Sequence, residues 1–325
     1  MSSTAIKFLA PFVDSYLRDP NLFGLGGIMD IIKIGACAVL LASQACASFS
    51  FAGGSSKPRN DKEWDPNQWN DCSYGCKKIP PDSQVLKKFS TGSQENLDSN
   101  RFRVLAWNLY KGRKPNFRQA FLKLTQDADV ILTSESVDSD PVQSSKLSIQ
   151  GMGWDFATNF LMKDNVGTGV SVGSRAVARD VRFSRTDDLE PFVKSPKAII
   201  MATFGIPGFQ QRLLAISIHG INWDDDEALG RQLRKILPEL KKHKGPIVFA
   251  GDYNTKNQIR VDIAKQVLGE AGLKRVSWDN PTQGKQLDDA FVRGVEVHSA
   301  RLIHDYVDDG SDHPAIDLDM TYHGK

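Results

Sequence analysis

The sequence has few cysteines, no long apolar run and almost no net charge. Four of the 325 residues are cysteine, and 41 Lys and Arg residues balance 39 Asp and Glu residues, giving a formal charge of +2. This balance excludes a protein that coats nucleic acid with its whole surface, but it allows local binding of an anion. Gly167-Thr168-Gly169 lacks a following Lys-Ser/Thr pair, which excludes a phosphate-binding P-loop.

The longest early apolar run, Ile34–Ala42, is much shorter than the ~20 residues of a membrane-spanning helix. It is followed by Ala45-Cys46-Ala47, the small-x-small pattern of a secretory cleavage site. We interpret residues 1–47 as a signal peptide region whose true start is Met29, and we expect a periplasmic or secreted protein. The alternative is an N-terminal amphipathic segment. Lipid attachment at Cys46 is disfavoured, because no aliphatic residue lies three positions before it.

Cys72 and Cys76 are the cysteines that remain after this region. Three residues separate them in a segment rich in Asp, Ser and Gly, which favours a local disulfide in an oxidising compartment. Two free thiols are the alternative, while a zinc site lacks two further ligands nearby. Residues 48–100 are rich in Ser, Gly, Pro, Asn and Asp, and we interpret them as an N-terminal extension stapled by this pair.

Residues 101–325 show the patterns of a folded catalytic domain of α/β class. Short apolar runs predict strands at Arg103–Leu109, Val130–Thr133, Gly169–Gly173, Ala198–Phe204, Arg212–Ile218, Pro246–Ala250 and Leu287–Val292. Apolar residues at helical spacing predict helices at Asn116–Asp127, Glu227–Lys241 and Asp262–Gly272, and we expect Pro238 to bend or end the second helix early. Strands outnumber helices, which predicts two packed mixed sheets flanked by helices rather than a doubly wound parallel sheet.

Three polar side chains follow apolar strand patterns. Asn108 ends one run, Glu135 ends the next, and His219 ends a third. Carboxylate and amide oxygens are ligands that Mg²⁺ accepts, so Asn108 and Glu135 are candidate metal ligands, and His219 is a candidate donor to a phosphate oxygen. Taken singly, each residue has an ordinary explanation as a turn former, a solvated loop acid or a structural histidine.

The run Pro246–Ala250 leads into Gly251-Asp252-Tyr253-Asn254. Residues two apart on an extended chain point to one side, so Asp252 and Asn254 can face the same group. We expect Asp252 to position or deprotonate an attacking water and Asn254 to donate to charge developing on phosphate oxygens. An Asx turn after the strand is the alternative explanation of these residue types.

Acidic residues and a histidine recur near the C-terminus, as Asp288 and Ser311-Asp312-His313. A carboxylate fixes the tautomer of a neighbouring imidazole and raises its basicity, so we pair Asp288 with His313 for proton transfer. Asp312 is then a second candidate metal ligand. Lys197 opens a predicted strand, and contact with a phosphate is one interpretation of it, but we favour an ordinary surface lysine.

The ordered set Trp107-Asn108, Glu135, Gly169–Arg175, His219, Gly251–Asn254, Leu287-Asp288 and Ser311–His313 resembles the endonuclease/exonuclease/phosphatase superfamily, over about residues 101–320. The resemblance implies a four-layer α/β sandwich and Mg²⁺- or Mn²⁺-dependent cleavage of phosphoester bonds. It implies a metal site at Asn108 and Glu135 and a water-activating, transition-state-stabilising pair at Asp252 and Asn254. Ser134, Tyr110 and Asp289 depart from the usual pattern and disfavour abasic-site repair. Asp289 adds negative charge where a polyanion is expected to bind.

These observations favour an exported, divalent-metal-dependent phosphodiesterase, with a nuclease slightly ahead of a phospholipid or inositol-phosphate hydrolase. A lipid enzyme needs an exposed apolar loop, for which Trp154–Phe156 and Trp223 are candidates and Phe209 is a poor one. A catalytically silent binding module of the same fold is the second class of function. We expect a monomer without a membrane-spanning segment in the mature chain, acting on a nucleic acid, phospholipid or inositol phosphate substrate.

Overall fold

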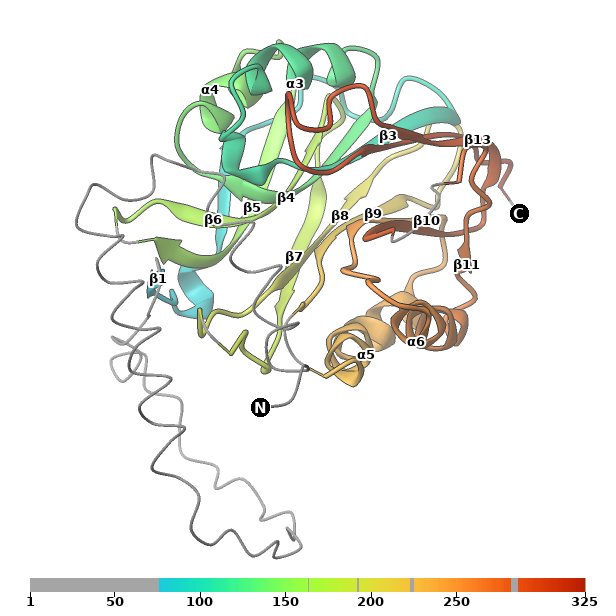
Figure 1. The fold of residues 1–325 in the computed structure, drawn as a ribbon. Coiled ribbons are helices and arrows are strands. Elements are labelled where there is room, and N and C mark those ends of the chain that lie inside the picture. The colour runs from blue at the N-terminus through green and yellow to red at the C-terminus, as the bar shows by residue number, and fades with distance from the viewer. Residues whose placement is uncertain (1–75, 163, 192, 223–224, 282–285, 325) are drawn as a thin grey trace, which may run out of the picture. The chain divides into compact units, whose positions relative to one another are not determined.

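A computed structural model describes residues 76–325 apart from 163, 192, 223–224, 282–285 and 325 (Figure 1). The signal peptide region 1–47, residue Cys72 and the candidate lipid-facing Trp223 lie outside the described residues. The predictions of export and of the Cys72–Cys76 disulfide therefore stay predictions.

Two mixed β-sheets form the centre of the described part of the chain. The larger sheet has the order β1-β5-β6-β4-β3-β14-β13, and β2 also pairs with β5. Its strands are β1 (Cys76–Lys78), β2 (Leu86–Ser90), β3 (Arg101–Asn108), β4 (Val130–Val137), β5 (Gly153–Met162), β6 (Gly167–Ser174), β13 (Glu296–Ile303) and β14 (Ala315–Thr321).

The smaller sheet has the order β11-β12-β10-β9-β8-β7. Its strands are β7 (Arg179–Arg185), β8 (Ala198–Phe204), β9 (Leu213–His219), β10 (Ile247–Asp252), β11 (Lys274–Arg275) and β12 (Asp288–Arg293). The pairs β3–β4 and β9–β10 are parallel, whereas the other strand pairs described here are antiparallel.

The strand residues alternate between the space separating the two sheets and the outer helical layers, because successive side chains point to opposite faces. On β3, Val104 and Ala106 belong to the core between the sheets, whereas Leu105 and Trp107 pack outward toward α3 (Phe117–Thr125) and α4 (Val142–Leu147). The predicted sandwich of two packed mixed sheets flanked by helices is confirmed (Figure 1).

The outer face of the smaller sheet is covered by α5 (Glu227–Lys242) and α6 (Gln258–Gly269). Leu229, Leu233 and Ile236 of α5 lie on one helix face, and they pack with Ile247 and Phe249 of β10. Pro238 lies inside α5, which continues to Lys242, so the helix does not end early at this proline, and a bend there stays a prediction.

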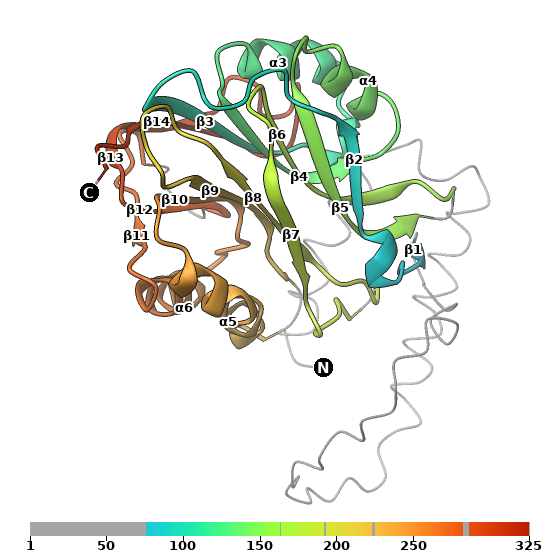
Figure 2. The ribbon, with the colours of Figure 1, turned by 180° about the vertical axis from the view of Figure 1, so that it is seen from behind.

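Residues 76–100, assigned from sequence to the extension, contribute β1 and β2 to the larger sheet (Figure 2). Their short, polar strands lack a clear period-two pattern, which is why the sequence did not reveal them. Among the described residues, no helix is long and apolar enough to cross a membrane.

Candidate active site

Three strand ends of the smaller sheet bring polar residues into one row. Asp252 ends β10 and lies opposite His219 of the parallel strand β9 and opposite Asp288 of the antiparallel strand β12. Gly220 follows His219, and a side chain there would meet the Tyr253 carbonyl at 2.4 Å, so the close approach of the two strand ends requires glycine. The register of the sheet therefore joins residues that are far apart in the sequence.

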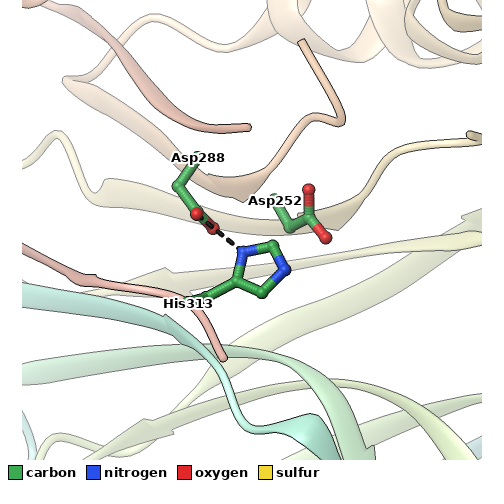
Figure 3. Close-up of side chains that lie close together, drawn as sticks. All are labelled: Asp252, Asp288 and His313. Atoms are coloured by element: carbon green, nitrogen blue, oxygen red, sulfur yellow. Dashed lines mark hydrogen bonds and ion pairs between the residues drawn. The ribbon is translucent and has the colours of Figure 1, made fainter. Parts of the chain in front are cut away.

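His313 reaches this row from the loop before β14 (Figure 3). Its Nδ1 lies 2.7 Å from Asp288 Oδ2, which confirms the proposed Asp288–His313 contact. Trp107 Nε1 donates to the His313 carbonyl at 3.0 Å, and Ser311 Oγ donates to the Asn108 carbonyl at 2.6 Å. These two bonds fix the loop against the end of β3. Ligand atoms of Asp252, Asp288 and His313 all lie within 4.8 Å of one another.

The electrostatics of these three residues separate their protonation states. Burial by itself would lower the pKa of His313, but Asp288, Asp252 and Asp312 raise that pKa well above its usual value. Burial and the charge of Asp288 raise the pKa of Asp252 to about 7, although the positive charge of His313 opposes the rise. At neutral pH, His313 is therefore an imidazolium, and Asp252 is poised to exchange a proton.

The side-chain amides of Asn108 and Asn254 are both hydrogen-bonded to neighbouring groups. Asn108 Nδ2 donates to Asp252 Oδ2 at 3.0 Å, while Asn108 Oδ1 accepts from the Tyr110 N–H at 3.0 Å. Asn254 has a left-handed φ of 52°, and its Nδ2 donates to the Gly220 carbonyl at 2.8 Å. Its backbone N–H donates to Asp252 Oδ1 at 2.9 Å, so the chain turns after β10 instead of staying extended as expected.

Glu135 lies at an irregularity of β4 between Thr133 and Ser136, where the strand shifts its pairing with β6. Its φ is +45°, and a fifth of its side chain is exposed. Lys111 Nζ donates to Glu135 Oε2. Burial alone would raise the pKa of Glu135, but the charge of Lys111, assisted by that of Lys197, holds it well below its usual range. Glu135 is therefore an ionised carboxylate.

Asp312 is exposed beside this group. Its carboxylate is partly desolvated and is repelled by Glu135, and both effects raise its pKa, while His313 and Lys111 act in the opposite direction. The negative charges of Asp312 and Glu135 therefore repel each other across the site.

His219 is buried beside Lys197, whose Nζ lies 3.1 Å from His219 Nε2 and 3.3 Å from Glu190 Oε1. Burial and the Lys197 charge lower the pKa of His219 well below its usual value, so the ring is neutral. An ammonium can only donate, so Nε2 of the neutral ring accepts from Lys197. His219 Nε2 also lies 3.6 Å from Asp252 Oδ2.

The interpretation of Lys197 as a surface lysine is wrong, since only 8% of the residue is exposed. A lysine before an apolar strand gives no sequence signal for burial, and the same holds for Lys111 in a turn. Asp289 is also placed differently from the expectation. It is fully buried and bonded through both oxygens to Arg275 Nε, because adjacent strand residues point to opposite faces. Its charge is therefore turned away from Asp288.

A buried lysine is bonded to the residue that follows Glu135. Lys146, 1% exposed, donates through Nζ to Ser136 Oγ and, at 2.6 Å, to Ser171 Oγ. Ser171 Oγ also lies 2.5 Å from Thr133 Oγ1, so this network bridges both sides of the irregularity in β4. Burial lowers the pKa of Lys146 to about 7, and the charge of Asp138 compensates only in part. Nζ lies 4.9 Å from the centre of the Trp154 ring.

Every sequence-predicted site residue thus belongs to one region at the strand ends. Direct contacts join Asp252 to Asn108, Asn254 and His219, and join Asp288 to His313. Ligand atoms of Asp252, Asp288 and His313 lie within 4.8 Å of one another, and charge interactions connect Glu135 and Asp312 to this group. Carboxylates dominate the donor set, which is the chemistry that hard divalent cations such as Mg²⁺ prefer. The residues therefore fit a divalent cation.

Known proteins are similar to this chain in sequence and in fold. The sequence model of the Endonuclease/Exonuclease/phosphatase family matches residues 105–313. The chain is similar to a UPF0294 protein of Vibrio parahaemolyticus, with 28% identity over 237 residues that cover 71% of this chain and 82% of the relative.

Solved structures of low sequence identity share the fold. The human Nocturnin catalytic domain with a bound sulfate anion has a TM-score of 0.55 at 17% identity, covering 75% of this chain and 99% of that domain. A mannosyl-6-phosphatase of Bacteroides thetaiotaomicron has a TM-score of 0.52 at 14% identity, covering 68% of this chain and all of the phosphatase. The family match spans more than half of the chain, and it confirms the resemblance inferred from the motifs. The chain belongs to the Endonuclease/Exonuclease/phosphatase family.

Proposed function

We propose that this protein is an exported, divalent-metal-dependent phosphodiesterase, with a nuclease as the favoured activity. Its family membership indicates a phosphoester hydrolase. The observation that carries the finer proposal is the convergence of Asp252, Asp288 and His313 beside Glu135 and His219. These residues come from separate strands and loops, and a structural role alone gives no reason to gather so many buried charges in one place.

Glu135 and Asp312 are the residues that would hold the cation. Glu135 is ionised and partly exposed, and Asp312 lies close enough to sense its charge. The cluster of Asp252, Asp288 and His313 is the less suitable place, because an imidazolium has no free lone pair and Asp288 is already bonded to it. When bound, the cation would polarise the phosphate and offset its developing negative charge.

The chain's own residues divide the remaining tasks. Asp252 accepts a proton from the attacking water, since its pKa of about 7 suits a base at neutral pH. His313 carries a proton that it can deliver to the leaving oxygen, and Asp288 orients its ring through Nδ1. Lys197 presents an ammonium that can donate to a phosphate oxygen, a task assigned from sequence to His219.

A phospholipid substrate is disfavoured by the surroundings of the candidate lipid-facing residues. Trp154 and Phe156 are fully buried in β5, and Phe209 packs on Tyr322 with ring centres 4.8 Å apart. The large apolar side chains that are exposed in the described residues are Leu86, Leu147 and Ile259, which lie on separate elements. They form no continuous apolar loop of the kind that enters a lipid interface. This comparison favours a water-soluble substrate.

The second candidate is a phosphomonoester such as an inositol phosphate. Lys111 contacts Glu135 and Lys197 contacts His219, so two ammonium groups belong to the site, and a doubly charged terminal phosphate has more oxygens to accept from them than a diester. A fold shared with a mannosyl-6-phosphatase accommodates such chemistry.

The test is hydrolysis by the purified chain with Mg²⁺ or Mn²⁺ and then with chelator, on plasmid DNA, RNA, sphingomyelin and inositol phosphates in parallel. Asp252→Ala and His313→Ala should each abolish activity, whereas the exposed neighbours Asp305→Ala and His304→Ala should retain it. Metal-independent hydrolysis, or hydrolysis that survives both site substitutions, refutes the mechanism. Absence of hydrolysis on all four substrates favours a catalytically silent binding module.

Export is a separate part of the proposal, supported by the sequence of residues 1–47. Mass spectrometry of the protein recovered from the periplasm or medium should find a mature N-terminus close to Ala47. An intact N-terminus on cytoplasmic protein contradicts it.

A further inference from the structure

Lys111 is bonded to Glu135, the carboxylate that is best suited to hold a divalent cation. Its Nζ donates to Glu135 Oε2, and only about a fifth of either side chain is exposed. An ammonium that is bonded to a carboxylate satisfies the charge that would otherwise attract a metal ion. Lys111 and a divalent cation would therefore compete for the Glu135 carboxylate.

The local backbone is built to hold Lys111 there. Tyr110, Lys111 and Gly112 all have positive φ angles, of 47°, 56° and 69°. Side chains other than glycine adopt this conformation rarely, so two such residues in succession need support from their surroundings. Leu109 N–H donates to the Ser134 carbonyl at 2.9 Å, and Tyr110 N–H donates to Asn108 Oδ1, which ties the turn to the segment that carries Glu135.

The other cations of the site have different partners. Lys197 lies between Glu190 and His219, His219 is neutral, and His313 is bonded to Asp288. Lys114 points elsewhere, toward exposed Asp308 at 3.4 Å. Lys111 is thus the described cation that is bonded directly to Glu135.

We propose that Lys111 is a resident counter-ion of Glu135 that competes with a divalent cation and, once displaced, becomes free to contact the substrate phosphate. The inference rests on the proposed function for the presence of that cation. It predicts two states of one side chain: Lys111 bonded to Glu135 without metal, and Lys111 released with metal. A ligand shifts such an equilibrium only by its difference in affinity for the two states, so removal of the competitor must tighten metal binding.

The test is calorimetric titration of the full chain with Mn²⁺ alone, which needs no substrate. Lys111→Met should bind Mn²⁺ about tenfold more tightly than the wild type, within the range of typical coupling between ligands. Lys114→Met is the matched control, because it removes the same charge three residues away, and its affinity should equal that of the wild type. Equal or weaker binding by Lys111→Met overturns the inference while leaving a metal-dependent hydrolase intact. Failure of every variant to bind Mn²⁺ overturns both.

A second measurement uses the unaltered protein, so it remains decisive if Lys111→Met fails to fold. Brief acetylation followed by mass spectrometry reports how accessible each amine is. Saturating Mg²⁺ should raise the acetylation of Lys111 severalfold and leave that of Lys114 unchanged. Lys111 acetylation that stays constant or falls with Mg²⁺ contradicts the release of this side chain.

Discussion

Replacing the buried Lys146 by methionine should remove a pH dependence from the free energy of unfolding. Burial lowers the pKa of this ammonium from 10.5 to about 7. At about 1.4 kcal/mol for each pKa unit, the charged form costs the folded state up to about 5 kcal/mol. Methionine has a similar length and no charge, and it gives up the bonds to Ser136 and Ser171, each worth about 1 kcal/mol.

The sign follows from proton binding. Between pH 7 and 10.5 the unfolded chain keeps the Lys146 proton while the folded chain has lost it, so the free energy of unfolding rises with pH. The slope approaches about 1.4 kcal/mol per pH unit. Below pH 7 both states are protonated, and the full cost is present. Lys146→Met should therefore be the more stable protein at pH 6, and its advantage should shrink by roughly 2 kcal/mol between pH 7 and pH 9.

The assay is urea unfolding followed by tryptophan fluorescence at pH 6, 7, 8 and 9. Exposed Lys123 provides the control, because Lys123→Met removes the same group from the surface of α3 and should run parallel to the wild type. Parallel profiles for Lys146→Met and the wild type would refute the argument that burial lowers the pKa of Lys146.

Two further predictions concern the charges of the site itself. Asp288→Asn removes the main group that raises the pKa of His313, so ¹⁵N NMR of labelled histidines should show His313 losing its proton at a clearly lower pH in the variant than in the wild type; unchanged titration contradicts the pairing. Lys197→Met removes the repulsion that lowers the pKa of His219, so that pKa should rise, and the KM for a hydrolysed substrate should increase about tenfold or more for a lost charged contact. An unchanged KM contradicts the assignment of Lys197 to phosphate binding.

The row of strand-end residues could be predicted from the sequence because each one follows or opens a strongly apolar run. Asp252 and Asp288 meet because β10 and β12 pair directly, a pairing that the sequence patterns do not specify. The orientation of Asp289, opposite to that of Asp288, could also have been predicted, because successive side chains of a strand point to opposite faces. The sequence motif by itself does not distinguish Asp288 from the neighbouring Asp289.

The two lysines could not be predicted in this way. The burial of Lys197 depends on Glu190 and His219, which lie in other parts of the chain, and no local pattern announces that contact. Lys111 reaches Glu135 through a left-handed turn, which residues other than glycine adopt only with tertiary support. Strands β13 and β14 escaped notice because their charged residues interrupt the apolar pattern on the exposed face.

The most direct test of the central claim is anomalous diffraction from crystals of the full chain soaked in Mn²⁺ and inorganic phosphate. We expect a manganese peak beside Glu135 and Asp312, with Lys111 withdrawn from Glu135. A peak within the Asp252, Asp288 and His313 cluster, or the absence of any peak at Glu135 in crystals that hydrolyse substrate, would contradict it.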